Sequence, residues 1–234
     1  MSIESITVTA SDLANLGELL PKWQPDTELV FGKGLRLDQA VVDALAGGDQ
    51  YGSIRIFSCV FEGPIDFRSE PFLGENFYLG TSVFDSNVSF AGCKFPGPGS
   101  VSLDSNTFCG DVDFSGADFD QRSLSFSAKE IGGDCRFDGA QFGERASFSG
   151  DYRNLVSFKD CDLPSISMRF GPGTFTGEVD FSRWRLPATA ELFIQGFNGA
   201  RAFQGGVITT GVQLDGTVVV TSPEQAEILA WHTP

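Results

Sequence analysis

Phenylalanine recurs at a nearly constant interval through the middle of the chain. Phe114 stands two residues after Val112, and the same apolar-x-Phe triplet returns at steps of 21 to 24 residues. Alternate residues of a β-strand face the same side, so each triplet predicts a short strand that faces a common core. The anchor positions of this pattern are Phe67, Phe90, Phe114, Phe137, Phe158, Phe181 and, more weakly, Phe203.

Three further apolar columns accompany the anchors. A Phe or Leu follows each anchor by five residues, usually with a small residue two positions before it, and another apolar residue precedes the anchor by six. The remaining side is less regular. Four apolar corners in each repeat predict a chain that winds through four short faces. Successive coils would then lie ~4.8 Å apart, which is the spacing of paired strands.

The segments VDFSG (112–116) and ADFDQ (117–121), like CRFDG (135–139) and AQFGE (140–144), resemble the pentapeptide-repeat family. The motif of that family is a small residue, Asp or Asn, Leu or Phe, and two variable residues. The resemblance covers about residues 53–205 and implies a right-handed quadrilateral parallel β-helix, here with 6–7 coils of 21–24 residues. The coils are longer than the 20 residues that four pentapeptides supply, which makes this a Phe-rich, irregular variant.

The two ends of the chain predict caps on one continuous structural domain. Residues 1–52 predict an N-terminal cap of a strand and short helices, with Ser11 as an N-cap and a second helix over Leu37–Ala46. Residues 53–205 form the repeat. Residues 206–234 predict a strand and a helix that Ser222 caps, with Pro223 at its first position. Because exposed solenoid ends stack on neighbours, caps favour a discrete particle.

The charge excludes several classes of partner. The 234 residues carry 31 acidic and 16 basic side chains, for a net charge of −15. Such a surface disfavours direct nucleic-acid binding and contact with anionic membranes, and it suits a basic groove on another protein. No apolar run reaches the ~20 residues that span a bilayer. With no secretory signal and an odd number of cysteines, five, we expect a cytoplasmic protein.

Residues for common catalytic chemistry are scarce. His232 is the only histidine and lies two residues from the C-terminus, so neither a catalytic triad nor a histidine-based metal site is predicted. We expect no cofactor and no metal. Cys59, Cys93, Cys135 and Cys161 fall on inward positions and predict small core residues. Cys109 falls on an outward position and is the one candidate for a reactive thiol.

Acidic residues on outward positions predict an interaction face: Asp66, Asp113, Asp118, Asp138 and Asp180. Neighbouring coils would place Asp113 beside Arg136 and Asp138 beside Lys159 as weak surface ion pairs. Charges of both signs alternate along this column. This alternation disfavours the paired carboxylates of a glycosidase, although adjacent coils could bring two carboxylates ~5 Å apart.

Two residues break the rule that the position before the second Phe column is small, and these are Glu70 and Trp184. Either they point outward, or the coil widens there into a pocket. In a pocket, Glu70 with nearby Glu75 would be candidate general acids. Trp184 between Arg183 and Arg185 would be a candidate site for an anionic ligand.

The sequence therefore favours a non-enzymatic interaction module, an acidic rigid rod. The family resemblance implies one specific form, a DNA mimic that modulates type II topoisomerase, with DNA gyrase or topoisomerase IV as the protein partner. An enzyme of secondary metabolism, a cyclase, isomerase or lyase with an aromatic-lined pocket, is the alternative. A self-assembling scaffold is the second alternative, and a homodimer stays open.

Overall fold

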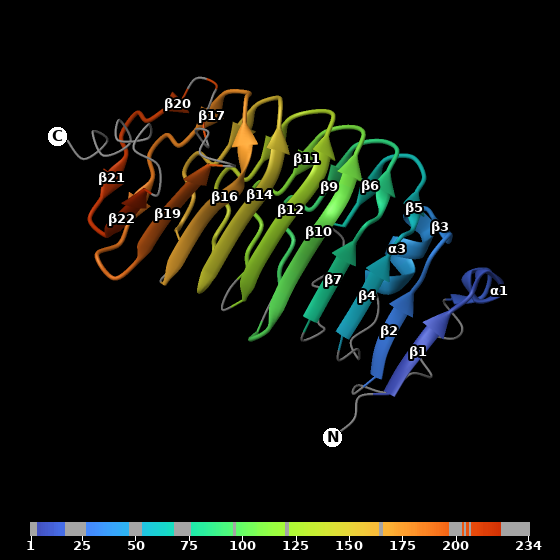
Figure 1. Ribbon diagram of the computed structural model, residues 1–234. Coiled ribbons are helices and arrows are strands. Elements are labelled where there is room, and N and C mark those ends of the chain that lie inside the picture. The colour runs from blue at the N-terminus through green and yellow to red at the C-terminus, as the bar shows by residue number, and fades with distance from the viewer. Residues whose placement is uncertain are drawn as a thin grey trace.

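The computed structural model describes residues 4–16, 27–46, 53–67, 76–95, 97–119, 122–163, 166–196, 203, 205 and 207–220. The chain winds as a parallel β-solenoid of about eight turns, with each coil stacked on the one before it (Figure 1). The predicted all-β parallel helix is confirmed. The number of turns exceeds the predicted six to seven because strands near both termini join the same sheet.

One broad sheet of 13 strands runs the length of the solenoid, and we call it the long-strand sheet. Its ten main strands pair in chain order: β1 (Glu4–Val8), β2 (Thr27–Phe31), β4 (Ser53–Phe57), β7 (Asn76–Gly80), β10 (Ser100–Phe108), β12 (Ser123–Ile131), β14 (Arg145–Tyr152), β16 (Ser167–Phe175), β19 (Glu191–Gly196) and β22 (Thr217–Val220). Three short strands complete it, β3 (Arg36–Leu37), β5 (Val60–Phe61) and β8 (Val83–Phe84). The sheet therefore includes strands outside the repeat boundaries predicted at residues 53 and 205.

A second sheet holds the predicted Phe anchors and is called the short-strand sheet. Its seven strands have two residues each: β6 (Ile65–Asp66), β9 (Val88–Ser89), β11 (Val112–Asp113), β13 (Cys135–Arg136), β15 (Val156–Ser157), β17 (Val179–Asp180) and β20 (Val207–Ile208). The next side of the coil is a line of single bridges from Lys94 to Arg185, which ends in the pair β18 (Arg185–Leu186) and β21 (Gln213–Leu214).

The coil that begins at β10 shows the four predicted sides. Ser105, with φ 58°, divides β10 into two straight halves. The chain then passes through β11 and turns at Ser115 and Gly116, where Gly116 takes φ 65°. The bridge residue Asp118 forms the fourth side. A positive φ suits glycine because it has no Cβ, so the two-residue turn can follow the anchor Phe directly.

The anchor rings stack in the order that the sequence predicts. Phe67, Phe90, Phe114 and Phe137 lie one above another, with successive ring centroids 4.4, 4.6 and 4.9 Å apart and planes within 6° of parallel. Rings from the long-strand sheet meet this column edge-on, as Phe126 does against Phe114 and Phe137 at 5.6 Å. The ring quadrupoles favour both offset-stacked and edge-to-face contacts, so aromatic packing joins the two sheets in several coils.

The N-terminal region differs from the predicted cap in two respects. First, β1 and β2 are strands of the long-strand sheet rather than parts of a separate cap. Second, the helix α1 (Ala10–Leu13) begins after Thr9, not after Ser11, and Thr9 with Asp12 forms a capping box. Thr9 is preferred because its hydroxyl and backbone N–H both reach the Asp12 carboxylate.

The helix α3 (Gln39–Ala46) confirms the second predicted helix but begins two residues later, since Leu37 belongs to β3. Its Gln39 side chain donates to the backbone carbonyl of Asp66 and accepts from the Asp66 N–H, both at 2.7 Å. The helix therefore covers the first strand of the short-strand sheet, which would otherwise expose an unpaired edge. The predicted C-terminal helix after Ser222 lies outside the described residues. No helix in the described part of the chain is long and apolar enough to cross a membrane.

Candidate binding surfaces

The structure does not bring the candidate ligand residues Arg183, Trp184 and Arg185 together. Trp184 is fully buried, whereas both arginines are exposed. The Trp184 Nε1–H donates to the backbone carbonyl of Phe158, 2.6 Å away. The coil neither slips to turn Trp184 outward nor opens a pocket around it, so both interpretations offered from the sequence are wrong for this residue.

The position of Trp184 has a clear structural reason. In earlier coils the Cys93 and Cys161 thiols donate to the carbonyls of the anchor residues Phe67 and Phe137 across 2.9 Å. The Trp184 indole makes the same bond to its own preceding anchor. The following core position is Leu186, as it is Leu163 in the coil before, where the earlier coils have Phe95, Phe119 and Phe142.

Arg183 forms a surface ion pair with Asp160 of the preceding coil, and both side chains are about half exposed. The Arg183 guanidinium holds the pKa of the Asp160 carboxyl below its ordinary value. The candidate acids Glu70 and Glu75 lie outside the described residues, so the structure does not place them.

Several of the predicted interaction residues are fixed by hydrogen bonds from their own turn or from the next coil. Asp113 Oδ1 accepts the N–H of Ser115, and Asp180 Oδ1 accepts the N–H of Ser182, each at 2.8 Å. Asp138 accepts the Ser157 hydroxyl and the Lys159 backbone N–H. These bonds hold the carboxylates in a defined direction on the outer side of the short-strand sheet.

The predicted charge neighbours lie side by side, but their contacts differ from simple ion pairs. Asp113 and Arg136 are register partners on β11 and β13, while the Arg136 guanidinium bonds to Asp134 at 2.6 Å. Lys159 reaches Asp138 through its backbone. Asp118 lies in the bridge column between Lys94 and Gln141. The outward columns therefore mix acidic, basic and neutral groups.

A ladder of Asx side chains at the corner before the short-strand sheet was not recognised from the sequence. Asn87 Oδ1 accepts the N–H of Asp111, and Asp111 Oδ1 accepts the N–H of Asp134, both at 2.9 Å. Asn or Asp directly before the anchor strand, in "SNVSF" and "GDVDF", is the sequence signal for this ladder. It extends the fixed acidic groups to the neighbouring corner.

Four of the five cysteines are buried and Cys109 is exposed, as the sequence predicts. Burial raises the pKa of the Cys59 thiol to about 11, and it raises the pKa of the Cys135 and Cys161 thiols strongly. A raised thiol pKa lowers the fraction of thiolate, which is the reactive form. The four buried cysteines therefore serve as small core residues.

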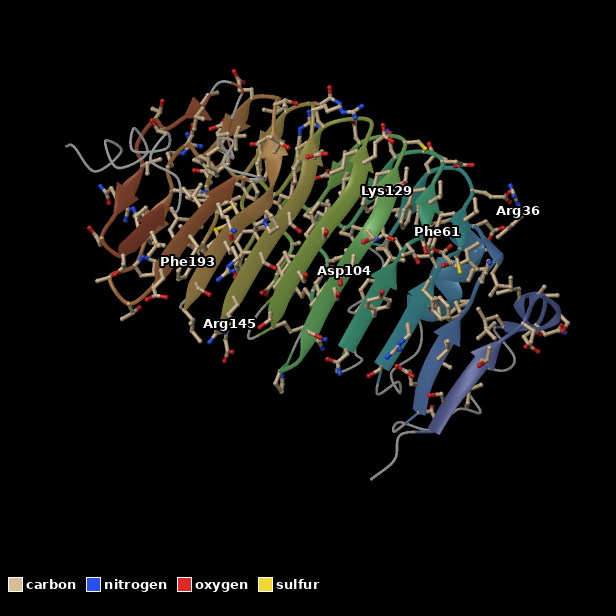
Figure 2. All side chains as sticks on the ribbon, in the orientation of Figure 1. Arg36, Phe61, Asp104, Lys129, Arg145 and Phe193 are labelled. Atoms are coloured by element: carbon tan, nitrogen blue, oxygen red, sulfur yellow. The ribbon has the colours of Figure 1, made fainter. Side chains whose placement is uncertain are left out.

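The broad outer face of the long-strand sheet carries a second surface that the sequence interpretation missed. Its outward residues form two rows across β10 to β16: Ser100, Ser123, Arg145 and Ser167, then Ser102, Ser125, Ser147 and Arg169. Figure 2 shows Asp104 and Phe193 on this face and Arg145 at the start of β14. Alternating segments such as "SVSL", "SLSF" and "RASFS" are the signal that could have revealed it.

Two shallow hollows lie on this face and share Ser100 and Ser102. The first, about 780 Å³, lies over β2, β4, β7 and β10 and includes Glu28, Arg55 and Tyr78. The second, about 400 Å³, lies over β10 to β16 and includes Arg145 and Arg169. The two hollows adjoin at these serines across successive coils, and we call the pair the serine groove.

No protein-family model, curated protein or solved structure matches this chain. Within the described ranges, His, Cys, Asp and Glu side chains do not gather into a group that could hold a metal ion. The features that bear on function are therefore the two outer surfaces and the packing that holds them.

Proposed function

We propose that the protein is a non-enzymatic interaction module, a rigid acidic rod whose short-strand sheet binds a basic surface of a partner protein in the cytoplasm. The observation that carries this proposal is the fixation of Asp111, Asp113, Asp138 and Asp180 by backbone N–H groups. A carboxylate that is already oriented loses little conformational entropy when a partner binds. The net charge of −15 favours the approach of a basic partner over an acidic one.

The stacked core supports the same proposal. Each carboxylate follows or flanks an anchor ring that is packed against rings above and below it, so the outward positions keep a regular spacing. The pentapeptide-repeat resemblance adds DNA gyrase or topoisomerase IV as a specific partner. Arg136 interrupts the column that contains Asp113, so this column is not an unbroken row of negative charge like that of DNA. The topoisomerase partner is therefore supported by the family resemblance and not by such a row. Binding to DNA gyrase or topoisomerase IV is the narrower form of the proposal.

The test compares two pairs of substitutions. Asp113→Asn with Asp180→Asn keeps each side-chain oxygen but removes two charges from the short-strand sheet. Asp43→Asn with Asp38→Asn removes two charges from exposed positions in and just before the helix α3. Purified gyrase and topoisomerase IV, and then a cell lysate, are passed over the immobilised wild type and both variants.

A protein that the wild type and the helix variant retain, and the sheet variant releases, supports the proposal. Loss of topoisomerase binding in all three rejects the narrower form. If every protein retained from the lysate binds the three equally, the short-strand sheet is not the interaction surface.

A further inference from the structure

The serine groove has a charge that is opposite to that of the chain as a whole. Arg145 and Arg169 both line its second hollow, and none of the described residues that line this hollow is a carboxylate. Neither arginine forms an ion pair within the described ranges. A net charge of −15 makes two unpaired guanidiniums on one hollow unusual, and their natural complement is an anionic group on a ligand.

The two arginines are diagonal neighbours. Arg145 pairs in register with Ser167, and Arg169 stands two residues beyond Ser167 on the same face of β16. The Arg169 guanidinium packs over the Phe193 ring, 5.1 Å from its centroid, which limits its freedom. Diagonal neighbours on paired strands lie ~7–8 Å apart, so the two guanidiniums can approach one carboxylate from two directions.

The floor of the groove presents serine side chains at the spacing of the strands. Beside them, the Asp104 carboxylate on β10 accepts the Ser102 hydroxyl at 2.5 Å and the Ser125 hydroxyl at 3.2 Å. Ser102, Ser125 and Ser147 are successive register partners on β10, β12 and β14. Paired strands lie ~4.8 Å apart, so the hydroxyls repeat at this interval along the solenoid axis. Because the Ser102 and Ser125 protons go to Asp104, these serine oxygens can accept hydrogen bonds from a ligand. A polymer of linked sugars offers donor hydroxyls at a comparable repeat and can bond to several of these oxygens at once.

Other anionic polymers suit the groove less well. An acidic peptide cannot add as a strand here because β10, β12 and β14 already pair on both sides. Proteins bind nucleic acids largely through many Lys and Arg contacts to phosphates. Two unpaired arginines on an acidic chain can make few such contacts. The bases would also need open aromatic faces, whereas Arg55 lies over the Tyr78 ring and Arg169 over the Phe193 ring.

We infer that the serine groove binds an acidic polysaccharide that contains uronic-acid residues. Arg145 and Arg169 bind a carboxylate, and the serine rows of β10 to β14 bond to the sugar hydroxyls. The polymer lies along the solenoid axis across successive coils. Glu28, at the far end of the groove, is already paired with Arg55 at 3.0 Å, so it offers less repulsion to the ligand. This site is on a different face from the proposed protein-binding surface.

The test measures binding of the full chain to three polyuronates, polygalacturonate, alginate and hyaluronate, by affinity electrophoresis and calorimetry. Methyl-esterified polygalacturonate, dextran, polyglutamate and polyphosphate serve as comparison polymers. The variant R145Q/R169Q removes the arginines of the groove. The variant R153Q/R185Q removes two exposed arginines elsewhere and gives the same net charge.

At least one polyuronate is expected to bind, and R145Q/R169Q should weaken this binding by at least about tenfold, since hydrogen bonds to charged groups are individually strong. R153Q/R185Q should retain the binding, and esterification of the polymer should remove it. The inference is overturned if none of the three polyuronates binds or if both variants lose binding equally. Equal or tighter binding of polyglutamate or polyphosphate would also overturn it, because it would assign the groove to an acidic peptide or a phosphate polymer.

Discussion

The strands β10 and β11 belong to the same coil but differ greatly in length, with nine and two residues. A long strand turns several side chains outward, so neighbouring coils build a two-dimensional array of hydroxyls and guanidiniums. A two-residue strand turns one side chain outward, and the result is a single column. In that column Asp113 and Asp180 accept the backbone N–H two residues further on in the same coil. Strand length therefore determines whether a face of this solenoid offers a groove or a row of fixed charges.

The largest effect is expected where one ring supports both faces. Phe114 stacks on Phe90 and Phe137 and meets Phe126 of the long-strand sheet edge-on. Phe114→Ala should lower the free energy of unfolding by about 3–5 kcal/mol, because it removes buried area and leaves a cavity. Urea unfolding measures this change, with Phe114→Leu as a milder control. An unchanged midpoint would show that the two sheets do not share their stability through this ring.

A smaller loss is expected at Trp184, which replaces the thiol of other coils. Trp184→Phe keeps an aromatic ring but removes the N–H that bonds to the Phe158 carbonyl. The free energy of unfolding should fall by about 1–3 kcal/mol, the cost of an unsatisfied buried acceptor. The same urea experiment measures the loss. If Trp184→Phe and the wild type have the same urea midpoint, the indole hydrogen bond contributes nothing to the free energy of unfolding.

Alkaline pH should destabilise the core through the buried thiols. Burial raises the pKa of Cys135 and Cys161 in the folded state, while an unfolded thiol titrates near ~8.5. The unfolded state therefore gains thiolate as pH rises above about 8.5, and the stability present at lower pH is progressively lost. The thermal midpoint, measured from pH 7 to 10, should fall across this window.

Cys135→Val is the matched control for the alkaline effect, since Val112 and Val156 occupy the same position in the neighbouring coils. The thermal midpoint of this variant should fall less steeply with rising pH than the thermal midpoint of the wild type. Identical slopes would mean that Cys135 ionises with an ordinary pKa.

The Asx ladder of the acidic corner should contribute about 1 kcal/mol at each bond. Asp111→Ala removes the acceptor of the Asp134 N–H and should lower the free energy of unfolding by this amount. Asp111→Asn keeps an oxygen in place, as Asn87 does one coil earlier, and should be nearly neutral. A loss in the Asn variant as large as in the Ala variant would assign the effect to charge instead of the hydrogen bond.

The smallest effect is expected at Cys109, at the corner between the long-strand and short-strand sheets. It is the exposed cysteine, so the native protein should react with about one equivalent of a thiol reagent and the unfolded protein with all five. Cys109→Ser should abolish the native reaction without changing stability. Rapid native reaction of further thiols would show that the core opens.

The interior was largely predictable because one large residue type repeats at each inward corner. The Phe columns and the inward cysteines follow from periodicity alone. Trp184 could not be assigned in this way, since its size breaks the rule and only the carbonyl of Phe158 explains its direction. The serine groove could not be predicted because the outward residues of the less regular side have no fixed spacing along the chain. Its serines line up only after the register of β10, β12 and β14 is known.

The separation of the two faces is tested most directly by titrating the best-bound polyuronate against two charge variants. If the groove binds the polymer, R145Q/R169Q loses at least about tenfold in affinity, and Asp113→Asn with Asp180→Asn leaves the affinity close to that of the wild type. If net charge alone governs binding, the two variants shift the affinity by similar factors in opposite directions. That second result would contradict the account of two independent surfaces on one aromatic core.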